Sequence, residues 1–141
     1  MRRIILALVM FFTALWSASA CEMAFKLVDG TGSSRKILPG STIALDAGKS
    51  YTIKVEFTED HRNCLLEPED TLFLLDGAKW RVNKEDQGLV LTKAVTWFES
   101  GKSLNLTDLV FKAATPGKYG LTILRECAKG GYDEVINFVV K

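Results

Sequence analysis

The chain has 141 residues, with 18 basic and 17 acidic side chains and only three cysteines. This length suits one domain with a hydrophobic core and is too short for two. Charges of both signs are interspersed and nearly cancel, so the sequence lacks the basic face that binding to nucleic acid requires.

Residues 1–20 have the organisation of a secretory signal peptide. Two arginines precede an apolar stretch over residues 4–16, and Ala18-Ser19-Ala20 places small residues before a cleavage point. We therefore expect an exported protein, periplasmic or secreted, whose mature chain begins at Cys21. The apolar stretch is too short to span a bilayer, and no later segment offers the roughly 18 apolar residues of a membrane helix.

Two readings of Cys21 stay open. An ordinary signal peptidase would cleave after Ala20 and release the mature protein. Alternatively, Ser19-Ala20-Cys21 resembles the end of the lipobox of bacterial lipoproteins, in which the first mature residue is a lipidated cysteine that anchors the protein to a membrane. Ala18 departs from that pattern, because a large aliphatic residue usually stands there. Lipidation of Cys21 would leave Cys64 and Cys127 as an even pair.

The rest of the chain consists of short apolar runs separated by turn residues. Residues 51–57 alternate strictly between apolar and polar side chains, which is the pattern of a half-buried strand. Asp46-Ala47-Gly48-Lys49 predicts a tight turn before it, and Asp76-Gly77 predicts a hairpin turn. Further strands are expected over residues 24–28, 42–45, 72–75, 80–82, 89–97, 104–111, 119–124 and 137–140.

About seven to eight short strands without a convincing helix predict an all-β fold, a single antiparallel β-sandwich over residues 21–141. The segment 116–123, Pro-Gly-Lys-Tyr-Gly-Leu-Thr-Ile, resembles the corner before the penultimate strand of exported bacterial immunoglobulin-like domains, with Tyr119 at the corner. Leu121 stands where antibody domains have a cysteine, so the antibody type is excluded.

The immunoglobulin-like resemblance implies a position for the cysteines. Strands 51–57 and 119–124 would run in the same direction in facing sheets, so Cys64 and Cys127 would lie at one end of the sandwich. This implies a Cys64–Cys127 disulfide, which would stabilise the domain by about 4 kcal/mol on the chain-entropy model. Cys21 should fall near the same end.

An alternative use of this end is metal or redox chemistry. Cys21, His61, Cys64 and Cys127 could supply thiolates and an imidazole to copper(I) or zinc, and these ligand types suit both ions. His61 lies three residues before Cys64, but no Cys-x-x-Cys or second histidine accompanies it. The competing reading is a plain disulfide, an exposed histidine and no cofactor.

The loops that carry the cysteines are also rich in charge and glycine. They define a candidate binding surface composed of His61, Arg62, Arg125, Lys129 and Tyr132. In the competing reading, this region is a solvated hairpin that only connects strands.

Chagasin-like inhibitors of cysteine proteases are exported immunoglobulin-like domains of similar size. The turn at residues 46–49, the segment 111–114 and Leu124-Arg125 resemble the layout of that family. Its inhibitory motifs are absent, since Asp60-His61-Arg62-Asn63-Cys64 and Arg125-Glu126-Cys127 stand in their place, and Ser100-Gly101-Lys102 matches its glycine-rich loop weakly. The resemblance implies the fold and carries over no inhibitory residue.

The sequence offers no constellation for catalysis, so we expect a protein that is not an enzyme. The leading interpretation is a cell-envelope binding or structural module with an unknown protein or small-molecule ligand. A periplasmic metal- or redox-handling protein and a protease-inhibitor-like module are the alternatives. Trp80 is expected in the core, and one ring of the consecutive pair Trp97-Phe98 should face solvent.

Overall fold

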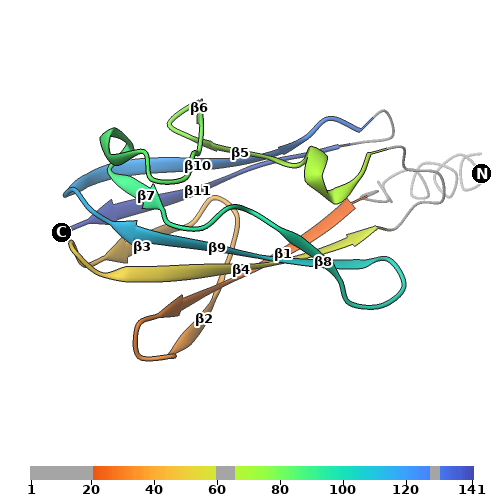
Figure 1. Ribbon diagram of the computed structural model, residues 1–141, viewed down its shortest axis with the longest axis horizontal. Helices are drawn as coiled ribbons and strands as arrows, with labels where there is room; N and C mark the ends of the chain where they lie inside the picture. Colours follow the sequence, from red (N-terminus) through yellow and green to blue (C-terminus); the bar gives the residue numbers. More distant parts are fainter. Residues whose placement is uncertain (1–20, 60–65, 128–130) are drawn as a thin grey trace, which may run out of the picture.

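Eleven strands and two three-residue 3-10 helices form the part of the chain that the computed structural model describes, which is residues 21–59, 66–127 and 131–141 (Figure 1). The expected signal segment and residues 60–65 and 128–130 lie outside it. The strands form two stacked sheets, so the predicted all-β sandwich is confirmed. Within the described ranges, no helix is both long and apolar enough to cross a membrane.

The first sheet has the strand order β2-β1-β4-β9-β7. Strand β8 also pairs with β9, nearer the start of β9 than β7 does. The strands of this sheet are β1 (Cys21–Asp29), β2 (Ser34–Ile37), β4 (Ser50–Glu59), β7 (Leu89–Leu91), β8 (Trp97–Glu99) and β9 (Leu104–Ala113).

The second sheet has the order β3-β11-β10-β5-β6. Its strands are β3 (Thr42–Leu45), β5 (Leu72–Leu75), β6 (Ala78–Lys79), β10 (Gly117–Arg125) and β11 (Tyr132–Val140). The pairing of β3 with β11 is parallel, and all other pairings between these named strands are antiparallel. The 3-10 helices η1 (Pro68–Asp70) and η2 (Glu85–Gln87) flank the β5–β6 hairpin. Two differences from the expected strands raise their number: β2 was not expected, and the expected strand over residues 89–97 is divided into β7 and β8. Residues 80–82 lie outside the named strands, and the two-residue β6 ends just before them.

The core fills the space between the sheets, and the period-two pattern explains its residues. Tyr51, Ile53, Val55 and Phe57 of β4 all point inward and are buried, as their alternation predicts. Trp80 is 4% exposed and its indole N–H donates to the carbonyl of Leu89 at 2.7 Å, so the core prediction for this residue is confirmed.

Two further local predictions are confirmed. Asp76 and Gly77 have φ values of 48° and 80°, and two consecutive left-handed residues make the tight turn that joins β5 to β6. In β8, Phe98 is 63% exposed whereas Trp97 is partly buried against the core, so one ring of this pair faces solvent.

Strands β4 and β10 end at the same end of the sandwich, to the right in Figure 1, which we call the cysteine end. Cys21 is paired with Glu59, the last residue of β4. The guanidinium carbon of Arg125, the last residue of β10, lies 4.2 Å from the ring centroid of Phe57. The shared direction of these two strands therefore agrees with the arrangement expected from the sequence.

Candidate functional site

Arg125 is 1% exposed, so it is not part of an exposed binding surface, and the prediction that placed it there is wrong. The residue ends β10, and its side chain points between the sheets and covers the face of Phe57. A cation above an aromatic ring gains electrostatic attraction, which is stronger where water is excluded.

The buried guanidinium of Arg125 binds the segment that leads into β5. Its Nη1 donates to the carbonyl of Glu67 at 3.0 Å and to Oγ1 of Thr71 at 2.8 Å, and its Nη2 donates to the carbonyl of Leu66 at 3.2 Å. These bonds offset the cost of burying the charge and fix η1 against the cysteine end. Arg125 is thus a structural residue that positions a loop.

Tyr132, also predicted for the binding surface, is half-buried. It is paired with Arg125 across β10 and β11, and its ring lies 6.4 Å from that of Phe25. Its hydroxyl is buried without a hydrogen-bond partner among the described residues. Burial, with a smaller contribution from the charge of Glu134, raises the pKa of Tyr132 to about 12.

The other predicted residues of this end are only partly placed. Cys21 is buried and Cys127 is half-buried. His61, Arg62, Cys64 and Lys129 lie outside the described residues, so the Cys64–Cys127 disulfide and the proposed copper or zinc set stay predictions. Among the described residues, no group of three or more histidine, cysteine, aspartate or glutamate side chains is placed to hold a metal ion.

A groove on one open side of the sandwich, between β5–β6 and the β7–β8 edge, is a second candidate site. We call it the aromatic groove. It has a volume of about 360 Å³, within the range of ligand pockets. Its apolar lining consists of Leu72, Phe73, Trp80, Val82, Leu91, Ala94, Val95 and Trp97.

An irregularity in the edge of the first sheet shapes this groove. β9 pairs with β7 at Leu91 and Phe111 and with β8 at Trp97 and Thr107. The edge strand runs six residues from Leu91 to Trp97, whereas β9 runs only four from Phe111 to Thr107. Residues 92–96 therefore form a bulge with two extra residues. Bulges bend a strand and redirect side chains. Here the bulge places Val95 and Trp97 in the groove, where Trp97 stacks on Phe73 with ring centroids 6.4 Å apart.

The backbone of β8 is unpaired on its outer side, since β8 pairs only with β9 in the part of the chain that the structure describes. The N–H of Ser100 donates to the carbonyl of Leu104, so Phe98, two residues earlier, also directs its N–H and carbonyl toward β9. The N–H and carbonyl groups of the alternate residues Trp97 and Glu99 therefore point outward, away from β9. The groove is therefore bordered by an edge that a further strand could join.

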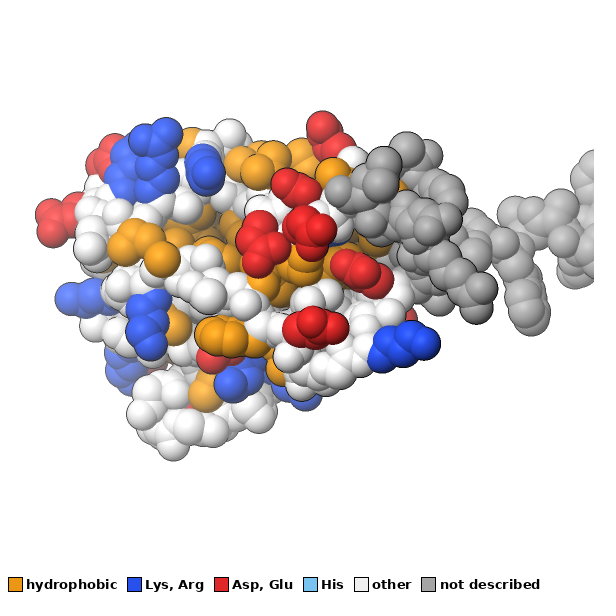
Figure 2. Space-filling model, turned by 45° about the vertical axis from the view of Figure 1, so that its right-hand side comes forward, with side chains coloured by type: hydrophobic (Ala, Val, Ile, Leu, Met, Phe, Trp, Pro, Cys, Tyr) orange, Lys and Arg blue, Asp and Glu red, His pale blue; other side chains and the backbone are white. Residues whose placement is uncertain are grey.

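The charges around the groove differ between its two ends. Glu69 of η1 lines the end nearest the cysteine end, and Glu67, Asp70 and Glu99 are exposed on the adjoining elements. Figure 2 shows acidic side chains gathered around hydrophobic ones on this face. Two basic residues, Lys79 and Arg81, line the end beside β6.

One signal of this site is visible in the sequence, the consecutive aromatic residues Trp97-Phe98. It did not indicate the bulge, because residues 92–96 combine apolar and polar side chains without a period. No protein-family model matches the chain, and no curated protein matches it either, so the site is interpreted from its geometry alone.

Proposed function

We propose that the mature protein is an exported, non-enzymatic binding module with an immunoglobulin-like fold, which holds an extended peptide segment of a partner along β8 and the aromatic groove. The observation that carries this proposal is the outward-facing backbone of β8 beside the aromatic side chain of Trp97. An extended peptide can add to such an edge through main-chain hydrogen bonds, while pockets for alternate side chains provide specificity.

Two observations support the immunoglobulin-like assignment. The orders β1-β4-β9-β7 and β11-β10-β5 correspond to the ABED and GFC sheets of that fold. The hydroxyl of Tyr119, near the start of β10, donates to the carbonyl of Thr115 at 2.8 Å. A tyrosine that bonds the backbone a few residues upstream at this corner is typical of such domains.

Export and the Cys64–Cys127 disulfide belong to the same proposal. The organisation of residues 1–20 supports export, and the common end of β4 and β10 favours the bridge, because Cys64 and Cys127 follow these strands. Intact mass of protein purified from membranes and from the soluble fraction distinguishes the two forms of Cys21. A mass equal to residues 21–141, apart from disulfide hydrogens, would reject the lipid anchor.

The chemistry of the groove defines the ligand we expect. An apolar side chain of the peptide would lie against Val95 and Trp97, and a basic side chain would lie near Glu69 and Glu99. Attraction between exposed charges is screened by salt, so the affinity should fall as ionic strength rises.

The test uses a synthetic nine-residue peptide of alternating valine and threonine with two lysines at one end. We expect the amide NMR signals of Trp97 and Glu99 to shift on titration. Glu99→Pro removes an outward N–H but no bond to β9, and we expect it to weaken binding by about tenfold. Glu99→Ala is the matched control, since it removes the charge and keeps the N–H, and it should lose about threefold at most.

Equal binding by Glu99→Pro and wild-type protein, with the rest of the spectrum unchanged, would reject strand addition at β8. Concentration-dependent sedimentation of the protein alone, abolished by Glu99→Pro, would identify the occupant as a second copy of this chain and would also reject the peptide ligand.

A further inference from the structure

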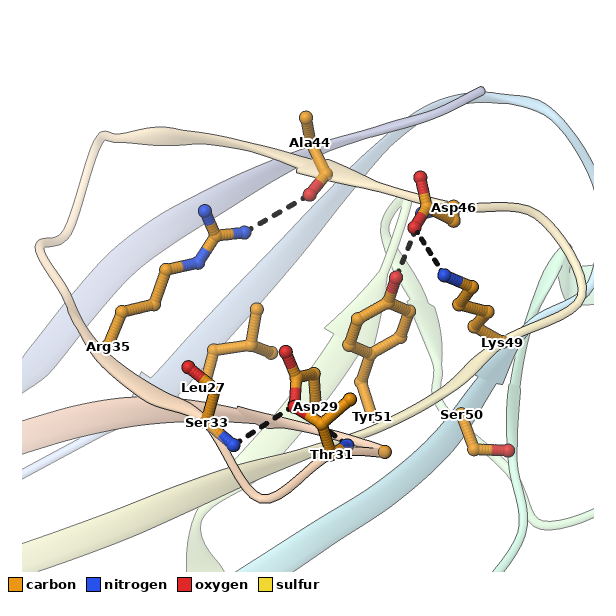
Figure 3. A pocket seen from close by; sticks show the side chains of 11 residues that line it. Leu27, Asp29, Thr31, Ser33, Arg35, Ala44, Asp46, Lys49, Ser50 and Tyr51 are labelled. Carbon is orange, nitrogen blue, oxygen red and sulfur yellow. Dashed lines mark hydrogen bonds and ion pairs between the residues drawn. The ribbon is translucent and has the colours of Figure 1, made fainter.

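A second, polar groove lies on the opposite side of the sandwich from the proposed peptide site. There the outer strand β2 of one sheet separates from the outer strand β3 of the other. The space has a volume of about 570 Å³, and both its walls carry charged groups (Figure 3). We call it the polar groove. Nothing in the proposed peptide function uses it.

Asp29 provides a rigid carboxylate on one wall. Its Oδ1 accepts three hydrogen bonds, from the N–H of Thr31 at 2.9 Å, from the hydroxyl of Thr31 at 2.6 Å and from the N–H of Ser33 at 3.1 Å. Hydrogen bonds from Thr31 are the main cause of the lowered pKa of Asp29, so the group is ionised at neutral pH. All three bonds involve Oδ1, which leaves Oδ2 to accept hydrogen bonds from a ligand.

Arg35 provides the opposite charge at the mouth of the groove. It extends from β2, and its Nη2 donates to the carbonyl of Ala44 in β3 at 3.1 Å, so it bridges the edges of the two sheets. A guanidinium has five N–H donors in a planar fork that matches a carboxylate. The bond to Ala44 uses one of them and leaves the others for a ligand.

Tyr51 stands at the base of the polar groove with its side chain buried. Its ring packs on Phe111 with centroids 5.9 Å apart, and its hydroxyl oxygen accepts the N–H of Asp46 at 2.9 Å. The hydroxyl proton is therefore available to a ligand. Beside it, Asp46 and Lys49 form an exposed ion pair at 3.0 Å, which such exposure makes weak and easy to rearrange.

We propose that the polar groove binds a small zwitterion of the amino acid or dipeptide class, with its ammonium group on Asp29 and its carboxylate on Arg35. A positive group is favoured beside Oδ2 of Asp29 and the face of Tyr51, and a negative group beside the fork of Arg35. Asp29 is already oriented by its three hydrogen bonds, so binding requires little further ordering of this carboxylate.

The probe is glycylglycine, titrated into the full mature protein and followed by the amide NMR signals of Thr31 and Ser33. We expect saturable shifts. Asp29→Asn keeps an oxygen that accepts the three existing bonds but removes the charge, and Arg35→Gln removes the fork. Each should weaken binding by about fivefold or more. Lys36→Gln is the control. Lys36 is exposed beside Arg35 but does not line the groove, so this substitution should leave the affinity unchanged.

Single-charge probes separate this proposal from simple ion attraction. Ethylammonium and propionate should each bind about tenfold more weakly than glycylglycine. Shifts that do not saturate, equal affinity for ethylammonium and glycylglycine, or unchanged binding by Asp29→Asn would each overturn the proposal. Because Glu99→Pro lies at the opposite edge, it should leave glycylglycine binding intact whether or not the peptide site exists.

Discussion

The guanidinium of Arg125 lies over the ring of Phe57, with 4.2 Å between its central carbon and the ring centroid, and so joins the last residue of β10 to β4, a strand of the other sheet. The same group holds the backbone at residues 66–68. One buried cation therefore fixes both the sheet-to-sheet packing and the loop that leads to β5.

The first prediction concerns this residue. Arg125→Ala leaves a cavity over Phe57 and removes several hydrogen bonds, so the free energy of unfolding should fall by about 3–4 kcal/mol in urea titrations. Arg125→Lys keeps the charge and loses the fork, and should lose about 2 kcal/mol. Exposed Arg81→Ala is the control, with an expected change of about 0.5 kcal/mol or less. A loss of under about 1 kcal/mol for Arg125→Ala would contradict the structural role.

Tyr132 should make the protein sensitive to alkali. Its pKa is near 10 in the unfolded chain and about 12 in the folded protein, because burial disfavours the phenolate. A raised pKa of an acid means that stability is intact below pH 10 and declines between pH 10 and 12, and because the side chain is only half-buried, solvent screening limits the loss to about 1 kcal/mol. Tyr132→Phe should remove this decline and should not destabilise the protein at pH 7, since the hydroxyl has no hydrogen-bond partner among the described residues. Unfolding curves at several pH values measure both effects.

Any side chain at position 88 is expected to destabilise the fold. Gly88 has a φ of 69°, and a Cβ there would lie 2.3 Å from the hydroxyl oxygen of Tyr119. Gly88→Ala should therefore lower the free energy of unfolding by about 2–3 kcal/mol, through strain and overpacking together. Gly40→Ala is the matched control, because Gly40 has a φ of 76° but open space around its Cβ position, so only the backbone cost of about 1 kcal/mol should appear. Equal effects in thermal or urea unfolding would show that contact with Tyr119 is unimportant.

The expected Cys64–Cys127 disulfide has a direct chemical test. The exported, unreduced protein should show at most one reactive thiol after denaturation, and reduction should lower the free energy of unfolding by about 4 kcal/mol. Three thiols together with stoichiometric copper or zinc would instead support the metal-handling alternative.

The periodic parts of the fold were predictable from the sequence. Strict alternation over residues 51–57 identified β4 and its inward face, because burial on one side of a strand repeats every two residues. The Asp76-Gly77 pair identified its turn for an equally local reason. Trp80 was assigned to the core from its strand context and its size.

The sites were much less predictable. The burial of Arg125 could not be predicted, because charged residues usually face solvent and the carbonyl groups that stabilise its burial come from a segment about 58 residues away. The aromatic groove depends on the bulge at residues 92–96, which arises from pairing with β9. The polar groove depends on the separation of β2 and β3, two edges whose distance no local pattern encodes.

The described domain begins with Cys21 at one end of the sandwich, and Lys141 lies at the other (Figure 1). A pulling force applied between these two residues runs along the strands. It would load the nine residue pairs of β1 and β4 in shear, all at once, and would not unzip them one by one. The parallel β3–β11 contact, with Lys141 bonded to both Leu45 and Ala47, resists in the same manner. The architecture is therefore suited to carrying mechanical tension along its long axis.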